Sequence, residues 1–479
     1  MANIPKFPIF ISLSGSIPSA EMGQAHRCGS QTHIINLTSC LHADTGIIKR
    51  RKVMSTVSRD LPAHPHLDVP KQQARELLRQ CQAKLSDALD RVRRQHPRLR
   101  NADDDKIAGS LKLSAAQLVI AREYGFSSWT QLKERITGNT VAQLIDKAIR
   151  SGDAEGVTRL LTAYPNLLHV PVRSGNWGPP MSHAANMGRL DMVKTIAAIG
   201  AKDYQHAFGR ALLHGDIEIA KWLHEHGAVF TPGVIMGSCE TLNDRGFGFL
   251  DDAGVPLTDG EGDKLAPLAM VLETYSRHPA GKHAILQRFR ARGYHWEDTP
   301  IMAFHCGDLQ RLKIHHRQHP ELIHQRFSYR EIYPPALGCA DDGRSGLHGT
   351  PIDGTTLLHL SIDFDEREIF DWLLEQGADV NATATIDEEG FGGHTPLFNA
   401  IVSDAYVNGR QRDAYMIRRL LDLGADIQKR TSLRKYLDWR EEPGWHIARN
   451  VTPLEWATHF PERGWVSQEG VSLIGATEK

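Results

Sequence analysis

The chain has 479 residues, of which 56 are lysine or arginine and 57 are aspartate or glutamate, giving a formal net charge of −1. This balance argues against a protein that binds nucleic acid or an anionic membrane over its whole surface. No apolar run approaches the roughly 18 residues that a membrane-spanning helix needs, so we expect no membrane partner. The six cysteines contain no Cys-x-x-Cys pair, which is typical of reduced thiols and predicts a cytoplasmic protein.

Residues 1–53 have no sustained periodicity and contain many serines, glycines and prolines. Such a segment buries too little apolar surface to offset its chain entropy, so we predict a disordered tail. Met54 is an alternative start, which would make the tail a misassigned extension. Residues 7–17 also resemble the apolar part of a signal peptide, but the run is short and is interrupted by Pro8 and Gly15.

Residues 54–138 are expected to form a small helical cap. Helices at 113–136 are predicted from Ser114 and Ser127 as N-caps, with Gly125 ending the first of them. Upstream, apolar residues recur at the spacing of one helical face. They are Ala74, Leu77, Leu78, Cys81, Leu85, Ala88, Leu89 and Val92.

The same N-terminal helices allow a second interpretation, a DNA-associated regulator. Gln117, Ala121 and Gly125 have the spacing that opens a DNA-binding helix-turn-helix, and basic residues outnumber acidic ones by about 14 to 8 across residues 70–136. The second helix does not complete the pattern, because polar residues stand where apolar ones should lock it. A nucleic-acid partner is therefore the weaker interpretation.

Further along, residues 353–384 fit one helix–turn–helix unit. Thr356 is placed to cap a short first helix, which Asp365 interrupts. The second helix carries apolar residues on one face. Gly377 follows it directly, where a left-handed residue can close the helix without a Cβ penalty. We therefore expect Gly377 to be the costliest glycine to replace.

The sequence Thr-x-Leu-His from Thr356, followed 21 residues later by Gly-Ala-Asp-Val-Asn from Gly377, resembles the ankyrin repeat. This resemblance implies an all-α ankyrin-repeat solenoid, in which helix–turn–helix units stack and short β-hairpin or loop fingers connect them. It also implies that His359 is structural and bonds to backbone near its own turn. Residues 117–129, which include Gln-Leu-Val-Ile-Ala-Arg-Glu-Tyr-Gly-Phe, are similar to the N-terminal segment of many bacterial ankyrin-repeat proteins.

Residues 139–479 are expected to contain about eight to nine such units with loop insertions. The largest insertion, residues 327–349, is predicted to be an irregular loop; insertions of this kind cost little, because closure entropy grows slowly with loop length. The other units are expected at residues 142–172, 179–200, up to 227, up to 254, 266–293, around 307, 395–424 and 452–474.

The resemblance implies a protein–protein interaction scaffold with an unidentified protein partner. Partners of stacked repeats bind a concave surface, which includes the side chains just before each inter-helix turn. Two of these, Met187 and Phe364, are predicted to be exposed apolar anchors. The candidate partner-binding residues are Arg150, Asn186, Met187, Leu213, His214, His305, Asp363 and Phe364.

No nucleophile elbow, phosphate loop or metalloprotease helix occurs in the sequence. We therefore expect no enzyme, no cofactor and no catalytic or metal site. The alternative is an enzyme or metal site in residues 327–349 and the nearby histidines, of which His315 and His319 share a helical face.

Overall fold

The computed structural model divides into two compact modules, an N-terminal module up to Ile145 and an array module from Asp146 onward. The predictions for residues 1–53, and for residues 341–348 of the insertion, lie outside the part of the chain that the structure describes. The structure describes residues 59, 61, 67–173, 175–340, 349–408, 413–437, 444–460 and 464–477, without the side chains of 138–140.

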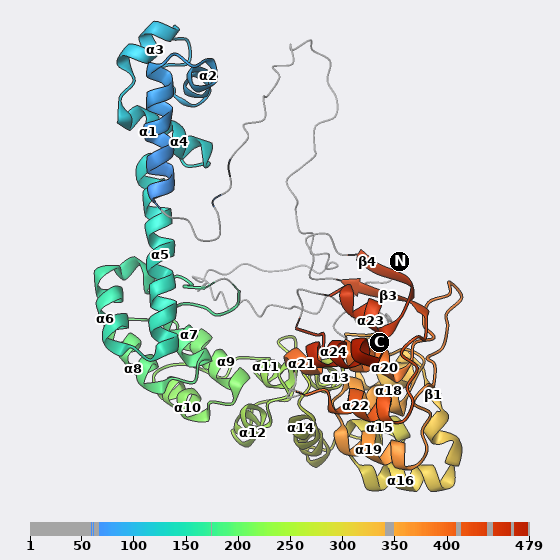
Figure 1. Cartoon of the computed structure of the whole chain (residues 1–479). Coiled ribbons are helices and arrows are strands. Elements are labelled where there is room, and N and C mark those ends of the chain that lie inside the picture. The colour runs from blue at the N-terminus through green and yellow to red at the C-terminus, as the bar shows by residue number, and fades with distance from the viewer. Residues whose placement is uncertain are drawn as a thin grey trace, which may run out of the picture. The chain divides into compact units, whose positions relative to one another are not determined.

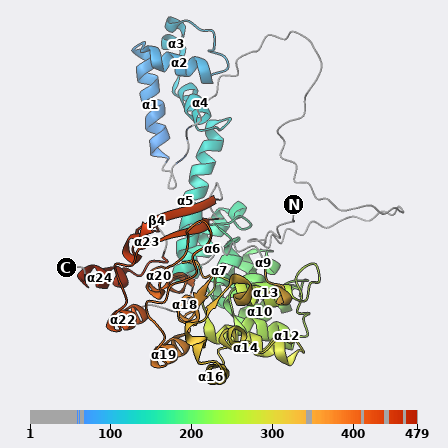
Figure 2. The same cartoon turned by 90° about the vertical axis from the view of Figure 1, so that its right-hand side faces the viewer.

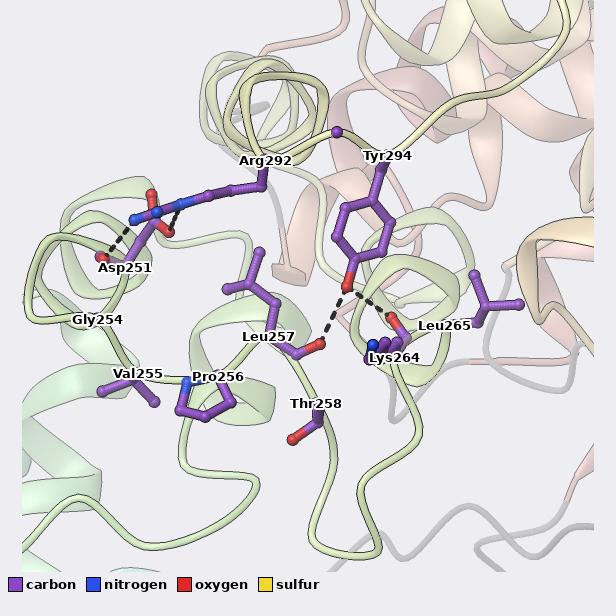
Figure 3. Close-up of a pocket in the computed structure, with 11 residues that line it drawn as sticks. Asp251, Gly254, Val255, Pro256, Leu257, Thr258, Lys264, Leu265, Arg292 and Tyr294 are labelled. Carbon is purple, nitrogen blue, oxygen red and sulfur yellow. Dashed lines mark hydrogen bonds and ion pairs between the residues drawn. The ribbon is translucent and has the colours of Figure 1, made fainter.

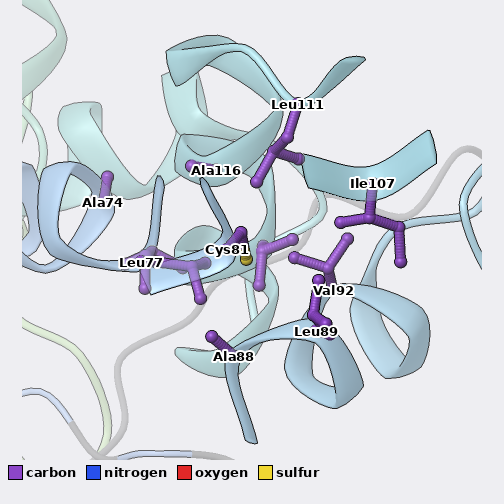
Figure 4. Close-up of a cluster of buried hydrophobic side chains, with 11 residues drawn as sticks. Ala74, Leu77, Cys81, Ala88, Leu89, Val92, Ile107, Leu111 and Ala116 are labelled. Carbon is purple, nitrogen blue, oxygen red and sulfur yellow. The ribbon is translucent and has the colours of Figure 1, made fainter. Parts of the chain in front are cut away.

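The N-terminal module is helical, as the sequence predicts. Its predicted apolar face is buried in one cluster, in which Ile107 and Ala116 from later helices join Leu77 and Val92 (Figure 4). Leu85 is the exception, because it lies in the turn after the first helix and is 52% exposed. The helices are α1 (Asp68–Gln82), α2 (Ser86–Gln95), α3 (Asp104–Ser110), α4 (Leu113–Glu123) and α5 (Trp129–Ser151).

Two predictions about the ends of these helices are wrong. Ser114 does not cap α4, because the helix already begins at Leu113. Ser128, rather than Ser127, accepts the hydrogen bond from the backbone N–H of Gln131, at 3.3 Å.

The predicted end of α4 at Gly125 is confirmed by its φ of +80°. The expected pair of helices around residues 127–136 and 142–151 is one continuous helix, α5. Leu132 and Ile136 are buried in a cluster of the N-terminal module. Ile145 and Ile149 are buried on the opposite face of the same helix, so its two ends pack against different neighbours.

The array module contains nine helix pairs within the described residues, the first formed by the end of α5 and by α6. Figures 1 and 2 show the later pairs following one another in chain order. Their helices are α6 (Ala154–Ala163), α7 (Pro180–Asn186), α8 (Leu190–Ile199), α9 (Tyr204–His214), α10 (Ile217–Glu225), α11 (Ile235–Glu240), α12 (Asp244–Asp252), α13 (Ala266–Glu273), α14 (Pro279–Ala291), α15 (Pro300–His305), α16 (Leu309–Gln318), α18 (Leu357–Asp363), α19 (Arg367–Glu375), α20 (Pro396–Ile401), α22 (Tyr415–Asp422), α23 (Pro453–Thr458) and α24 (Gln468–Thr477).

Neighbouring pairs stack through equivalent helices. First helices pack on first helices, as α9 does on α7 and α11, and second helices pack on second helices, as α8 does on α6 and α10. Apolar residues fill these contacts, and Leu373 of α19 is completely buried. The predicted all-α fold of stacked helix–turn–helix units is confirmed. Within the described residues, no helix is both long and apolar enough to cross a membrane.

The seventh pair forms as its sequence predicts. The backbone N–H of Thr356 donates to Nδ1 of His359 at 3.3 Å, and the hydroxyl of Thr356 lies 2.9 Å from the same nitrogen. The other ring nitrogen of His359 lies 3.2 Å from the carbonyl oxygen of His394 in the next finger. Gly377 has a φ of +85° and closes the second helix. The structural role expected for His359 is therefore confirmed.

In six of the pairs, the turn between the two helices contains a residue with positive φ. Glycine supplies it at positions 152, 188, 215 and 307, with φ between 63° and 77°. In the first and sixth pairs the following aspartate then caps the second helix, as Asp153 does by accepting from the N–H of Gly156 at 2.8 Å. Leu242 and Asp365 occupy the same turn position with φ of +50° and +59°. A side chain in this conformation is strained.

Asp365→Gly is expected to raise the free energy of unfolding by about 1 kcal/mol at pH 7, because it relieves this strain. The substitution also removes the Asp365 carboxylate, which is 8% exposed. Burial raises the pKa of this carboxylate to about 6. A raised carboxyl pKa means that the folded state binds the extra proton, so the stability contributed by Asp365 falls as pH rises from about 4 to about 6.

The measurement is urea unfolding at pH 4 and pH 7, with Asp365→Asn as the matched variant that removes only the charge. Relative to the wild type, Asp365→Asn should have a higher free energy of unfolding at pH 7 and nearly the same one at pH 4. Asp365→Gly should have a higher free energy of unfolding at both pH values. A loss of stability in Asp365→Gly at both values would contradict the strain.

The insertion after the sixth pair is not the irregular loop that was predicted. It begins at the end of strand β1 (Arg326–Phe327), which pairs antiparallel with β2 (Thr355–Thr356). A capped helical turn α17 (Tyr329–Ile332) and a 3₁₀ turn (Pro335–Leu337) follow. Short 3₁₀ turns also follow the second helices of the first and sixth pairs, at Pro165–Leu167 and Pro320–His324.

A second antiparallel hairpin, which the sequence did not suggest, precedes the ninth pair. It is formed by β3 (Thr431–Leu437) and β4 (Gly444–Val451), and Leu433 lies opposite Ala448. Leu433, Lys435 and Leu437 are buried along one face of β3, which is the period-2 pattern of a half-buried strand. A short helical turn, α21 (Ala405–Asn408), lies in the insertion of the eighth pair.

Candidate functional site

The eight predicted partner-binding residues lie in the inner-turn row, which we define as the two residues before each inter-helix turn. The row is open in the first three pairs and covered in the sixth and seventh. Met187 and Phe364 show the contrast, because each directly precedes the positive-φ residue of its turn. Met187 is 37% exposed, and Phe364 is 4% exposed.

In the open part, Asn186 is a buried hydrogen-bond acceptor at the centre. Its Oδ1 accepts from Nε of Arg210 at 2.7 Å and lies 3.0 Å from Nε2 of His214. The backbone carbonyl of Leu213 accepts from the hydroxyl of Thr241 at 2.9 Å, which ties the third pair to the fourth. The structure thus brings Asn186, Leu213 and His214 together on the first helices α7 and α9.

Arg150 lies at the first turn of the same row. Its guanidinium forms a 2.8 Å ion pair with Asp146 one helical turn earlier. Asp146 also lies 2.9 Å from Nε2 of the buried His183, and Arg189 donates to the backbone carbonyl of Arg150 at 2.8 Å. Polar contacts therefore join the first pair to the second.

Arg210 belongs to this surface, although sequence reasoning did not select it. It lies four residues before His214 on α9, and therefore on the same helical face. Its side chain is half-buried, and burial lowers the pKa of its guanidinium while Glu240 partly opposes that shift. The i, i+4 relation to His214 was the signal that could have identified it.

The covered part corrects one prediction. Phe364 is not an exposed apolar anchor, because its ring is enclosed by charged and aromatic side chains. The guanidinium carbon of Arg277 lies 4.7 Å from the ring centroid and Nζ of Lys282 lies 4.3 Å from it. Phe304 and His305 contact its edge. A polar residue at this position would disturb the core rather than an interface.

Asp363 and His305 are also buried, with 0% and 1% exposure. Asp363 pairs with the buried Arg277, whose Nη2 lies 2.9 Å from Oδ2 and whose Nε donates to the backbone carbonyl at 2.7 Å. Asp404, from the loop after α20, lies 3.9 Å from the same guanidinium. Burial raises the pKa of Asp404 to about 7, although Arg277 and Lys435 oppose the shift.

Lys282 and His305 form a second buried pair. Nζ of Lys282 lies 2.7 Å from Nδ1 of His305, and Nε2 of His305 lies 2.8 Å from the carbonyl oxygen of Ile332. Burial lowers the pKa of Lys282 to about 7, and burial and Lys282 lower the pKa of His305 well below its usual value. His305 is therefore neutral, accepting at Nδ1 from the lysine and donating at Nε2 to the insertion.

The insertion itself covers this part of the row. Tyr333 is completely buried and stacks on His305 with ring centroids 6.2 Å apart. The N–H of Ala340 donates to Glu273 at the end of α13, at 2.9 Å. Lys435 of β3 is also buried, at 4% exposure, and its charge acts on Asp404. The chain's own segments therefore occupy the place where a partner was expected.

A hollow of about 740 Å³ lies between the loop after α12 and the end of α14 (Figure 3). Two of its polar side chains pair with each other, Arg292 with Asp251 at 2.7 Å, and the hydroxyl of Tyr294 lies within 3.1 Å of two backbone carbonyls. Across the residues described, no group of three or more His, Cys, Asp or Glu side chains is arranged to hold a metal ion. The alternative metal site at residues 327–349 falls partly outside those residues.

Comparison with known proteins finds a family match at the seventh pair. The ankyrin repeat family model matches residues 353–385. Among solved structures, the chain is similar to the human ASB11 ankyrin repeat domain, with 18% identity over 62% of this chain and 97% of that chain, and a TM-score of 0.23. No curated protein matches the chain. The chain therefore has an all-α fold of stacked helix pairs that contains an ankyrin repeat at residues 353–385.

Proposed function

We propose that this chain is a protein-binding scaffold that contacts its partner through the open part of the inner-turn row. Arg150, Met187, Leu213 and His214 are the proposed contact residues, with Asn186 holding the polar side chains beneath them. One observation supports this choice above all: Met187 is 37% exposed, whereas Phe364 at the equivalent position is 4% exposed. The Phe364 ring is enclosed by Arg277, Lys282, Phe304 and His305. His305, Asp363 and Phe364 are therefore withdrawn as contacts.

The composition of the open part suits a protein partner. It combines an exposed methionine and a half-buried leucine with polar groups held by hydrogen bonds, and such a mixture of apolar centre and polar surround is typical of protein interfaces. We further propose a cytoplasmic location. The four described cysteines form no disulfide, which agrees with a reducing compartment.

Changing Met187 and Leu213 together to glutamine is expected to weaken partner binding at least tenfold while the fold stays intact. Surface changes usually alter the free energy of unfolding by no more than about 0.5 kcal/mol each, whereas apolar anchors dominate interface energy. The partner is first identified by replacing Met187 with a photo-crosslinking amino acid and sequencing the adduct. Its affinity for the wild type and the double variant is then measured.

Leu423→Gln is the matched control, because Leu423 is 49% exposed but follows a second helix rather than an inner turn. Melting temperatures of all variants establish that they are folded. If the double variant keeps wild-type affinity for the cross-linked protein, the open part is not the interface.

A further inference from the structure

One hydrogen bond within the described residues fixes the guanidinium of Arg210 and leaves its two terminal nitrogens unused. Nε donates to Oδ1 of Asn186 at 2.7 Å, and Asn186 is 7% exposed. The two terminal nitrogens of the guanidinium make no hydrogen bond with the described residues. A guanidinium fixed through Nε presents these nitrogens as a planar fork, which matches the two oxygens of a carboxylate.

No carboxylate among the described residues forms a hydrogen bond or ion pair with this fork. The charge of Glu240 on α11 acts on Arg210, but no hydrogen bond joins the two side chains; the Glu240 carboxylate accepts a hydrogen bond from the hydroxyl of Tyr275 at 2.8 Å. His214 shares the Asn186 acceptor and brings no negative charge. Asp146 is committed to Arg150 and His183 at the far end of the open part. A partly buried cation without a carboxylate partner is costly unless a ligand provides one.

The covered part of the row shows how this chain satisfies such a cation. There the guanidinium of Arg277 meets the carboxylate of Asp363 at 2.9 Å. An apolar side chain lies directly beside that pair, since the ring of Phe364 is 4.7 Å from the guanidinium carbon. In the open part, Met187 follows Asn186, which holds Arg210, and Leu213 lies three residues after Arg210 on α9. These two residues offer apolar surface, but no described carboxylate pairs with Arg210 there.

We propose that the open part of the inner-turn row binds an acidic peptide segment of the partner. In it, an aspartate or glutamate takes the fork of Arg210, and a neighbouring apolar side chain contacts Met187 and Leu213. This inference rests on the proposed function and specifies the chemistry of the partner. Arg210 is the specificity-determining residue, because the two oxygens of a carboxylate can accept one hydrogen bond from each terminal nitrogen and carry the opposite charge.

The experiment measures retention of the purified full chain on two immobilised libraries of random octapeptides. One library has glutamate fixed at the fourth position and the other has glutamine there, so that they differ by the charge alone. The glutamate library should retain at least fivefold more protein, and the excess should fall as salt is raised. Arg210→Gln should reduce retention to the level of the glutamine library, and Arg210→Lys should recover only part of it.

Arg135→Gln is the matched control, because it removes an exposed arginine from the N-terminal module; it should retain as much as the wild type. Melting temperatures within about two degrees establish that the variants are folded. Equal retention by the two libraries, or wild-type retention by Arg210→Gln, would overturn the acidic-peptide proposal. If either result is found but the Met187 and Leu213 double variant still loses affinity for the cross-linked partner, the open part is the interface and only the proposed recognition of an acidic residue is wrong.

Discussion

Arg277→Met is expected to lower the free energy of unfolding by about 3–5 kcal/mol, the largest effect of any single substitution proposed for this chain. Arg277 is 1% exposed and forms the cationic centre between Asp363 and Asp404, each of which is completely buried. Its Nη1 also donates to the carbonyl of Thr274 at 2.6 Å. Removing the guanidinium leaves buried carboxylates without their cation, and this desolvation penalty is what costs stability.

The loss is measured by urea unfolding at pH 7. Arg288→Met is the matched control, since Arg288 also bridges two aspartates but its side chain is 37% exposed; it should cost no more than about 1 kcal/mol. Adding Asp363→Asn to the Arg277 variant should recover part of the loss, because the orphaned charge is gone. Equal losses for the Arg277 and Arg288 variants would show that the buried cluster is not a strongly coupled network.

Gly392→Ala is expected to cost about 3 kcal/mol or more, against about 1 kcal/mol for Gly377→Ala. Both glycines have positive φ, at 110° and 85°. A Cβ at Gly392 would lie 2.0 Å from the carbonyl oxygen of Thr385, whereas a Cβ at Gly377 would meet nothing within 4 Å. Thr385 cannot move away cheaply, because its N–H donates to the carbonyl of Gly354 at 2.9 Å.

This comparison reverses the prediction that Gly377 is the costliest glycine to replace. Helix-end chemistry identifies Gly377 from local sequence, but the crowding at Gly392 arises where the finger at residues 386–393 folds back on itself and meets Ser432. Melting temperatures of the two alanine variants test the order. A larger drop for Gly377 than for Gly392 would mean that the finger adapts without cost.

Local patterns predicted the helix pairs because each pair carries its own signals. The glycine–aspartate turns, the Thr356 and His359 contact and the left-handed Gly377 all depend on residues close in sequence. The buried cluster depends on distant residues instead. Phe364 looks exposed from its position before a turn. It is enclosed by Arg277 and Lys282, more than 80 residues earlier, and by Phe304 and His305 of the preceding pair.

The same distinction explains the remaining differences. The β3–β4 hairpin has alternating burial that no helical pattern could reveal, and its Lys435 is buried next to the eighth pair's Asp404. α5 joins two stretches that were predicted as separate helices, and its buried residues lie on opposite faces at its two ends, so no single periodic pattern crosses the junction. Arg210 could have been selected from its spacing to His214, but its fixed position depends on the hydrogen bond to Asn186 in the preceding pair.

The central claim is that the inner-turn row is open in the first three pairs, covered in the sixth and seventh, and binds the partner where it is open. Hydroxyl-radical footprinting of the purified full chain, alone and with the cross-linked partner protein added, tests this without any substitution. We expect Met187 and Leu213 to react in the free chain and to be protected in the complex, while Phe364 stays unreactive in both and Leu423 reacts in both. Rapid reaction of Phe364 in the free chain, or a complex that leaves Met187 and Leu213 reactive, would contradict the claim.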